Sequence, residues 1–316
     1  MLAYILRRIA QLVPVILVLT VAVFAFVEAL PGSIVDTLVG TEGGDIEEAR
    51  AILTKEYGLD RPVHERYFLW LSRAVQFDFG NSLVTRRPIS LELLSRIPAT
   101  VYLAVVGISL SVLIAVPLGT LAAVRRNSAV DYSAQVTSLA GISIPEFWFA
   151  ILCVLFFSLY LGWLPSSGYV SPFVDFWGSL EFLILPAAAI GFRQAAFTTR
   201  LTRSSMLDEL GKEYVDTARA MGLPERRVIF RYTLRNAMIP TITISGLQLA
   251  NLLGGTVVLE SIFAWPGIGR AIFEAILQRD YPLIQAGVLV LGVIVVVMNL
   301  LVDLTYRLLN PRVKLA

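Results

Sequence analysis

The sequence has few of the residues that catalytic and metal sites require. Cysteine and histidine occur once each, as Cys153 and His64, and charged residues make up only 16% of the 316 residues. One cysteine excludes an internal disulfide framework. The lone histidine excludes a Cys/His zinc site and any Ser-His or Cys-His mechanism within membrane spans. Because no basic cluster with interleaved aromatic residues occurs, nucleic acid is not an expected partner.

Apolar residues are present in excess. They make up 56% of the chain, and the mean hydropathy is +0.73, whereas a soluble protein has about 45–50% apolar residues. The excess forms runs of about 20 residues, enough to cross roughly 30 Å of hydrocarbon as helices. We therefore predict an all-α polytopic membrane protein with six transmembrane helices. The apolar runs are 9–27, 97–124, 132–160, 182–199, 239–259 and 281–302.

Three details of these runs bear on their geometry. The runs 97–124 and 132–160 exceed what a perpendicular helix needs, so we expect tilt or interfacial turns in them. The first run is longer than the roughly 7–15 apolar residues of a signal peptide, so it is interpreted as a retained span. The prolines expected to kink their spans are Pro14, Pro117, Pro145 and Pro186.

Lysine and arginine cluster in alternate connections: before the first span, after the second, between the fourth and fifth, and after the sixth. The positive-inside rule places these segments, and both termini, in the cytoplasm. The connection at 31–98 also carries basic residues, but a loop of this length crosses regardless of charge. The expected domains are 1–30 with the first span, 31–98 as an external helical loop region, and 99–316 as a five-helix core with a cytoplasmic loop at 200–238.

The external loop region contains two helix signals. A capping-box pattern at 45–48 precedes an apolar helical period that stops at Gly58, and a second helix opens at Pro62 and runs to Ala74. A turn is expected at 79–81. The region is interpreted either as a cap packed over the bundle or as a docking surface for an external partner.

The cytoplasmic loop predicts a helix, a glycine turn and a second helix. The first helix spans 207–221 and ends at Gly222; the second restarts at Pro224 and runs to Met238. An apolar knob surrounds the turn, and it either packs on its own bundle or inserts into another protein. The knob consists of Ala218, Met221, Leu223, Val228 and Ile229.

This loop resembles a known element. Asp216-Thr217-Ala218-x3-Gly222 is similar to the EAA-x3-G loop of ABC importer permeases, which inserts as a coupling helix into the ATPase subunit. The chain departs from the pattern in having Asp for Glu, Thr for Ala, and 232–235 reading Tyr-Thr-Leu-Arg where the generic family has Ile-x-Leu-Pro. The residues that the resemblance assigns to ATPase coupling are Asp216, Thr217, Ala218, Arg219, Ala220, Met221, Gly222, Leu223 and Pro224.

Further segments resemble the dipeptide/oligopeptide/nickel branch of that family, in order along nearly the whole chain, and the B-type subunit in particular. They are 59–62 (LDRP), 78–80 (DFG), 144–148 (IPEFW), 161–165 (LGWLP), 200–207 (RLTRSSML), 233–237 (TLRNA), 263–270 (FAWPGIGR), 279–282 (RDYP) and 310–312 (NPR).

The resemblance implies an inner-membrane, multi-pass permease of a prokaryotic importer that works by alternating access. Its expected partners are a second permease, related rather than identical, two ABC ATPase subunits, an external solute-binding protein and membrane lipid. ATP and magnesium would bind the ATPase subunits, and this subunit would hold no cofactor or metal. The chain's Gly211-Lys212 pair lacks the upstream glycine of a P-loop, so the chain is expected to be a transporter subunit and not an enzyme. Di- and oligopeptides are the expected cargo; nickel chelates, glutathione and oligosaccharides stay open.

Two charges lie deep in predicted spans, where a charge is a functional candidate by default. Arg193 is interpreted either as a structural partner of Glu146 or as a cation that faces a cavity and meets the carboxylate of a peptide in transit. An ion-coupled secondary transporter is the alternative class, but it would need more deep carboxylates than Glu146.

The last external connection, 260–280, brings aromatic residues next to Pro and Gly. We expect it to form an external gate or a contact for the binding protein, and an interfacial anchor is the alternative. The residues expected to do so are Phe263, Trp265, Pro266 and Gly267.

Overall fold

The computed structural model describes residues 2–29 and 60–309. Within these ranges the chain is helical, with one isolated bridge between Asn81 and Pro88. The helix expected after the capping box at 45–48 lies outside the described residues. The chain packs as two compact units, one made of Met1–Thr100 with Pro266–Val296 and the other of Val101–Trp265 with Val297–Ala316.

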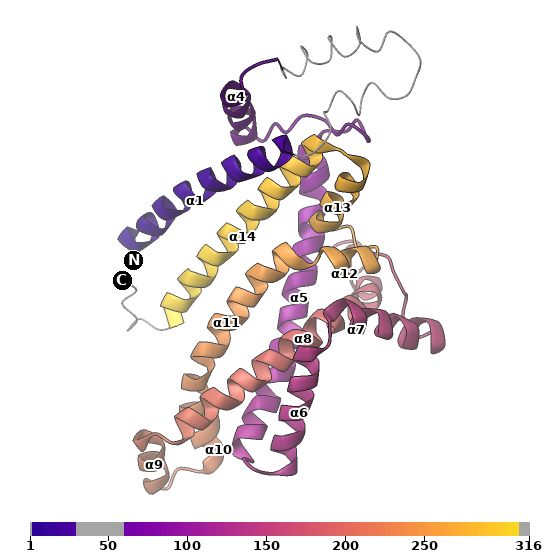
Figure 1. The fold of residues 1–316 in the computed structure, drawn as a ribbon. Helices are drawn as coiled ribbons and strands as arrows, with labels where there is room; N and C mark the ends of the chain where they lie inside the picture. The colour runs from indigo at the N-terminus through magenta and orange to yellow at the C-terminus, as the bar shows by residue number, and fades with distance from the viewer. Residues whose placement is uncertain (1, 30–59, 310–316) are drawn as a thin grey trace. The chain divides into compact units, whose positions relative to one another are not determined.

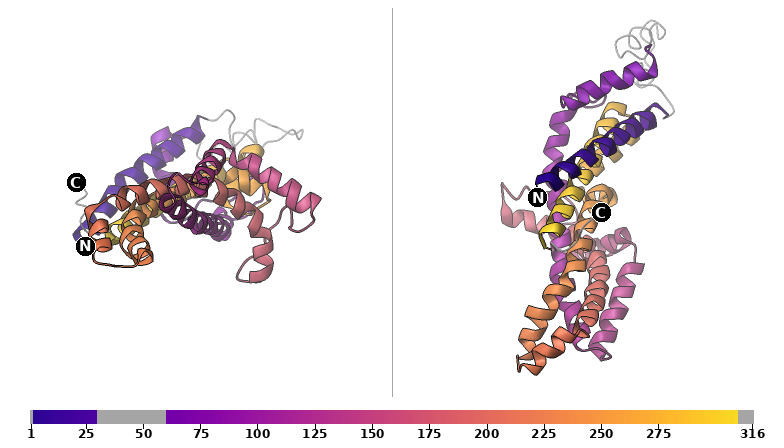
Figure 2. Two further views of the ribbon diagram at one scale, coloured as in Figure 1. Left: turned by 90° about the horizontal axis from the view of Figure 1, so that it is seen from below. Right: turned by 90° about the vertical axis from the view of Figure 1, so that its left-hand side faces the viewer.

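The first unit is built around the start of two long helices. Its core joins Ile89 and Leu93 to Ile268 and Ile284, all 2% exposed or less. Figures 1 and 2 show α1 and α14 running alongside each other, and a Cβ added at Gly292 would lie 2.6 Å from the Leu19 side chain. The elements of this unit are α1 (Leu2–Glu28), α4 (Val63–Val75), α13 (Ile268–Gln278) and the first parts of α5 (Ile89–Val124) and α14 (Tyr281–Leu309).

The predicted second external helix is confirmed as α4, with Pro62 at its N-cap. Two polar contacts attach it to the end of α1. The Tyr67 and Thr20 hydroxyls lie 2.9 Å apart, and Arg66 Nη2 donates to Glu28 Oε1 at 2.6 Å. None of the side chains of α4 is buried, and Phe68 is 63% exposed. The helix is therefore held on α1 while most of its surface stays open.

A buried carboxylate joins the start of α14 to the segment before α5. Asp280 is 1% exposed. Its Oδ2 accepts the Ser82 hydroxyl at 2.5 Å, and its Oδ1 accepts the backbone N–H groups of Leu83 at 3.2 Å and Leu283 at 3.4 Å. One side chain thus caps a helix and anchors a loop distant in sequence.

We expect Asp280→Ala to weaken this connection by about 2–3 kcal/mol, because it removes a helix cap and leaves buried donors unpaired. Limited proteolysis of the membrane-inserted protein should then cut residues 78–88 faster. Asp78→Ala is the matched control, because Asp78 is exposed and, among the described residues, its carboxylate accepts just the Gly80 N–H of its own turn, at 3.1 Å. Equal cleavage of the two variants would contradict the anchoring role.

The second unit is organised around α8 (Phe176–Leu210), which packs against α6, α7 and α11. Small residues allow close approach: a Cβ at Gly119 would lie 2.7 Å from the Thr199 carbonyl oxygen, and one at Gly141 would lie 2.7 Å from Ala196 Cβ. The other elements of this unit are α6 (Ala129–Ser143), α7 (Glu146–Cys153), the π-helical η1 (Val154–Tyr160), α9 (Glu213–Ala220), α10 (Glu225–Arg227), the π-helical η2 (Val228–Thr233), α11 (Leu234–Gly255), α12 (Val257–Ile262) and the ends of α5 and α14.

The predicted spans are found, and one of them is bent. Five helices of the described chain are long and apolar enough to cross a membrane, at Ala10–Glu28, Ile89–Val124, Phe176–Leu210, Glu225–Gly255 and Tyr281–Thr305. The run predicted as the third span, 132–160, corresponds to α6 with α7 and η1, which meet at 101°; counted as one bent span, this pair brings the number in the described chain to six. Pro145 is the N-cap of α7, so the expected kink is confirmed there. The other long run is one unbroken helix, α5.

The predicted helix at 207–221 is wrong in its start. The helix α8 continues past the apolar run to Leu210, Gly211 and Lys212 interrupt it, and α9 begins at Glu213. The restart at Pro224 is confirmed, but it leads through α10 and η2 into α11, beyond the predicted end at Met238.

Candidate functional site

The segment between α8 and α11 forms a small folded element at one end of these two helices (Figure 1). Gly222 has φ +75°, which is the left-handed backbone that ends α9. Pro224 then lies at the N-cap of α10 with φ −63° and ψ 140°. Glycine and proline thus set the reversal between α9 and α10.

This element has its own apolar core. Val215, Ala218 and Val228 are 0–2% exposed and pack together, with Leu210, Tyr214 and Leu223 around them. Ile229 is buried in a neighbouring cluster with Met206. Of the predicted knob, Met221 is the member that points outward, 67% exposed. Most of the predicted knob therefore packs on its own chain, and Met221 is the member left exposed.

Ion pairs fix the outer surface of the element. Arg219 Nη2 donates to Glu225 Oε1 at 2.8 Å, and Arg219 Nη1 lies 3.5 Å from Asp216 Oδ1. The hydrogen bonds to Glu225 raise the pKa of Arg219 above its already high ordinary value. Burial, followed by the hydrogen bond to Glu209, raises the pKa of Tyr214, whose hydroxyl donates to Glu209 at 2.6 Å.

The structure brings the predicted coupling residues together on this element. Ala218 is buried and Leu223 is partly buried, so these two hold the element rather than face a partner. The exposed members are Asp216, Thr217, Arg219, Ala220, Met221, Gly222 and Pro224.

The predicted deep pair also meets. Arg193 Nη1 lies 3.6 Å from Glu146 Oε2, and both residues line a cavity of 390 Å³. A second ion pair, which the sequence did not predict, has shorter contacts than the Arg193–Glu146 pair. Arg203 donates to Asp131 from Nε at 2.5 Å and from Nη2 at 2.8 Å. Asp131 lies before an apolar run and Arg203 after one, so the search for charges inside apolar runs passed over both.

The external segment differs from the expectation. Phe263 and Trp265 were expected to present aromatic surface, but they are 1% and 0% exposed. The Trp265 ring lies 4.8 Å from the ring of Tyr169 in an edge-on contact, and the Phe263 carbonyl accepts the Gly168 N–H at 2.9 Å. These two aromatic side chains therefore belong to the interior of the second unit. Partly buried Pro266 precedes Gly267, which is buried at the N-cap of α13 in the first unit.

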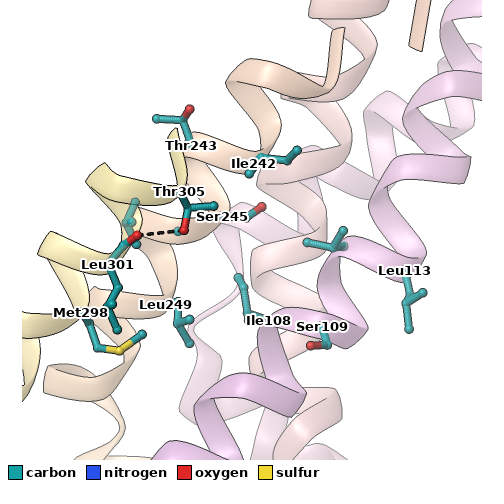
Figure 3. A pocket seen from close by; sticks show the side chains of 13 residues that line it. Ile108, Ser109, Leu113, Ile242, Thr243, Ser245, Leu249, Met298, Leu301 and Thr305 are labelled. Atoms are coloured by element: carbon teal, nitrogen blue, oxygen red, sulfur yellow. Dashed lines mark hydrogen bonds between the residues drawn. The ribbon is translucent and has the colours of Figure 1, made fainter. Parts of the chain in front are cut away.

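A second cavity, of 540 Å³, lies between α5, α11 and the end of α14 (Figure 3). Ile108, Leu249 and Met298 line it, together with hydroxyl groups such as that of Ser245. The described residues around it carry no charge. This groove is suited to an acyl chain or an apolar side chain rather than to a charged cargo.

Comparison with known proteins decides what kind of protein carries these features. Residues 115–315 match the family described as the binding-protein-dependent transport system inner membrane component. The chain belongs to this family. The permease has several apolar helices and is a multi-pass inner-membrane protein, and it is the permease subunit of an ABC importer.

Relatives of the permease match over its full length. It is 39% identical to the oligopeptide transport system permease protein AppB of Bacillus subtilis, over 99% of this chain and 100% of that protein. It is 39% identical to the glutathione transport system permease protein GsiC of Salmonella typhimurium and 38% identical to the dipeptide transport system permease protein DppB of Escherichia coli. Each of these two matches covers 99% of both chains.

The fold is found in a solved importer. An inward-facing structure of the MetNI methionine ABC transporter contains a chain that superposes with a TM-score of 0.57 at 18% identity. The match covers 70% of the permease and 97% of that chain. At this identity the likeness shows the fold and nothing about cargo.

Proposed function

We propose that the permease forms half of the membrane pathway of an ATP-driven importer of di- and oligopeptides. The names of its full-length relatives, which cover oligopeptide, dipeptide and glutathione transport, support peptide-type cargo. A second, related permease supplies the other half, and an external solute-binding protein delivers the peptide. Both termini and the 200–238 loop face the cytoplasm. These segments are rich in lysine and arginine, and connections of that kind stay on the cytoplasmic side of the membrane.

The observation that carries the proposal is the folded element at α9 and α10. Its internal core holds the Gly222 turn, and Asp216, Thr217, Arg219 and Met221 stay exposed on it. An ordered surface that joins a charged pair to an exposed methionine suits a cleft in a partner. Two ABC ATPase subunits bind ATP and Mg²⁺ and contact this surface, while the permease itself holds no cofactor. Differential contact with two states of the ATPase then drives alternating access.

The external parts are assigned by position. Residues 31–98, including the open surface of α4, contact the binding protein. Residues 263–267 form an external gate, in which Phe263, Trp265 and Gly267 are buried and Pro266 is partly buried.

The cargo is tested by reconstituting the permease with its partner permease, ATPases and binding protein in proteoliposomes. We expect ATP-dependent uptake of labelled dialanine and trialanine, with oligosaccharide (maltotriose) and nickel–histidine chelate as the competing cargos. Uptake that continues without ATP while a proton gradient is held would indicate a secondary transporter instead. Import of maltotriose or nickel–histidine without peptide import would overturn the peptide assignment, and preference for glutathione would narrow it.

A further inference from the structure

The 390 Å³ cavity that holds Glu146 and Arg193 lies where two helices are interrupted. The helix α6 ends at Ser143, α7 begins at Glu146, and α11 ends at Gly255, and all three positions line the cavity. Irregular backbone within membrane spans is tolerated where it lines a cavity or is buried in protein. The volume of the cavity, 390 Å³, is in the range of roughly 300–1,000 Å³ that small-ligand sites occupy.

The two charges in this cavity are incompletely satisfied by one another. At 3.6 Å their closest atoms are beyond the roughly 2.7–2.9 Å of a charge-assisted hydrogen bond. Glu146 Oε1 is buried and has no hydrogen-bond partner among the described residues, and the Arg193 side chain is 52% exposed. On the same helix α8, Arg203 makes two short bonds to Asp131, which is 1% exposed. The Glu146–Arg193 pair therefore keeps capacity for a ligand that the Asp131–Arg203 pair lacks.

Aromatic packing holds the backbone beneath both charges. The rings of Phe149 and Phe192 stack at 4.2 Å with an interplanar angle of 15°. Phe149 lies one turn after Glu146 on α7, and Phe192 precedes Arg193 on α8. Because the two helices are fixed here, the flexible part of the site is the long arginine side chain.

We propose that this cavity is a transit subsite for the charged ends of a free peptide, with Arg193 binding its terminal carboxylate and Glu146 its terminal ammonium. The inference rests on the proposed peptide cargo. The peptide brings one negative and one positive charge, so occupancy leaves no uncompensated charge in the membrane domain. An extended dipeptide spans up to about 7 Å, so the pair must separate on binding. The exposed guanidinium can swing to allow it.

A double-mutant cycle in the complete reconstituted importer tests the subsite. The variants are Arg193→Gln, Glu146→Gln and their combination, with exposed Arg126→Gln as the control for loss of one positive charge. The measured quantity is ATP-driven uptake of labelled dialanine at subsaturating loaded binding protein. We expect each single variant to lower uptake about tenfold, the double variant to be at least as low as the lower single variant, and the control to match wild type. The thermal midpoint of the complex should stay within about 2 °C of wild type in all of them.

A second measurement uses dialanine amide, which lacks the terminal carboxylate. For the amide, the ratio of uptake by Arg193→Gln to uptake by wild type should move toward one, because the lost contact requires both the guanidinium and the terminal carboxylate. Since both uptakes use the same binding protein, its own preference between dialanine and the amide cancels in this ratio.

Recovery of dialanine uptake in the double variant would show a structural pair and overturn the subsite. Wild-type uptake in all variants would overturn it too. Absence of ATP-driven dialanine uptake by the wild type would instead overturn the peptide cargo, and the subsite with it.

Discussion

Replacement of Gly222 by valine should weaken the stimulation of ATP hydrolysis by peptide while leaving the membrane helices inserted. Gly222 has φ +75°, where a non-glycine residue costs about 1–2 kcal/mol and a β-branched one more. A Cβ at this position meets nothing within 4 Å, so the effect arises from the backbone and not from a clash. Since 1.4 kcal/mol is a factor of ten in an equilibrium, we expect peptide-stimulated ATP hydrolysis to fall about tenfold or more.

The chain offers a matched control at Gly211, two residues before α9 begins at Glu213. Gly211 is also exposed, and a Cβ there would meet nothing closer than the Leu207 carbonyl oxygen at 3.8 Å, an ordinary contact. Its φ is −85°, which any residue adopts, so Gly211→Val should retain most of the stimulation. Gly222→Asn should lie between glycine and valine, because asparagine tolerates left-handed backbone better. Normal stimulation by Gly222→Val in a correctly assembled complex would refute the coupling role of this turn.

Replacement of Arg203 by methionine should give the largest loss of stability of any single change considered. Asp131 is 1% exposed and keeps only the Asn127 N–H and the Gln135 amide, each at 3.0 Å, once Arg203 is removed. Breaking a buried pair by removing one partner costs about 3–5 kcal/mol, and because the Arg203 side chain is 20% exposed we expect a cost at the lower end of that range. We expect the thermal midpoint of the complex in detergent to fall by on the order of 10 °C.

Two further variants separate loss of the pair from loss of packing. Asp131→Asn combined with Arg203→Met should recover part of the stability, because no unpaired charge remains buried. Arg193→Met should cost much less, since the Arg193–Glu146 atoms are 3.6 Å apart and the arginine is half exposed. Equal midpoints for Arg203→Met and wild type would rule out a stabilising role for the Asp131–Arg203 pair between α6 and α8.

The hydrophobic runs predicted the all-α membrane fold correctly because the bilayer selects helices long enough to cross it. Proline removes a helical hydrogen bond, and of the four prolines expected to kink their spans Pro145 lies at a break. The other three, Pro14, Pro117 and Pro186, lie within the helices α1, α5 and α8. The end of α8 was not predicted. The first charged residue marks where an apolar run leaves the lipid, but a helix ends where its backbone hydrogen bonds end. The helix α8 therefore continues for eleven residues past Thr199, to Leu210.

The candidate sites were predictable to different degrees. The coupling segment has a local signature, a glycine and a proline two residues apart, and its turn follows from Gly222 and Pro224. The Asp131–Arg203 pair joins residues 72 positions apart, and no local pattern reports such a contact. The inward position of Trp265 was equally hidden, because tryptophan is common both inside proteins and at the membrane interface.

In the α9–α10 element, different residues determine the fold and the chemistry of the exposed surface. Val215, Ala218 and Val228 fix the shape, so the outward side chains at Asp216, Thr217 and Met221 are free to change without loss of the fold. If the element binds the ATPase as proposed, a few surface positions can therefore determine which ATPase the permease recognises. Changes at these positions alone would then let the permease bind a different ATPase while its membrane pathway stays the same.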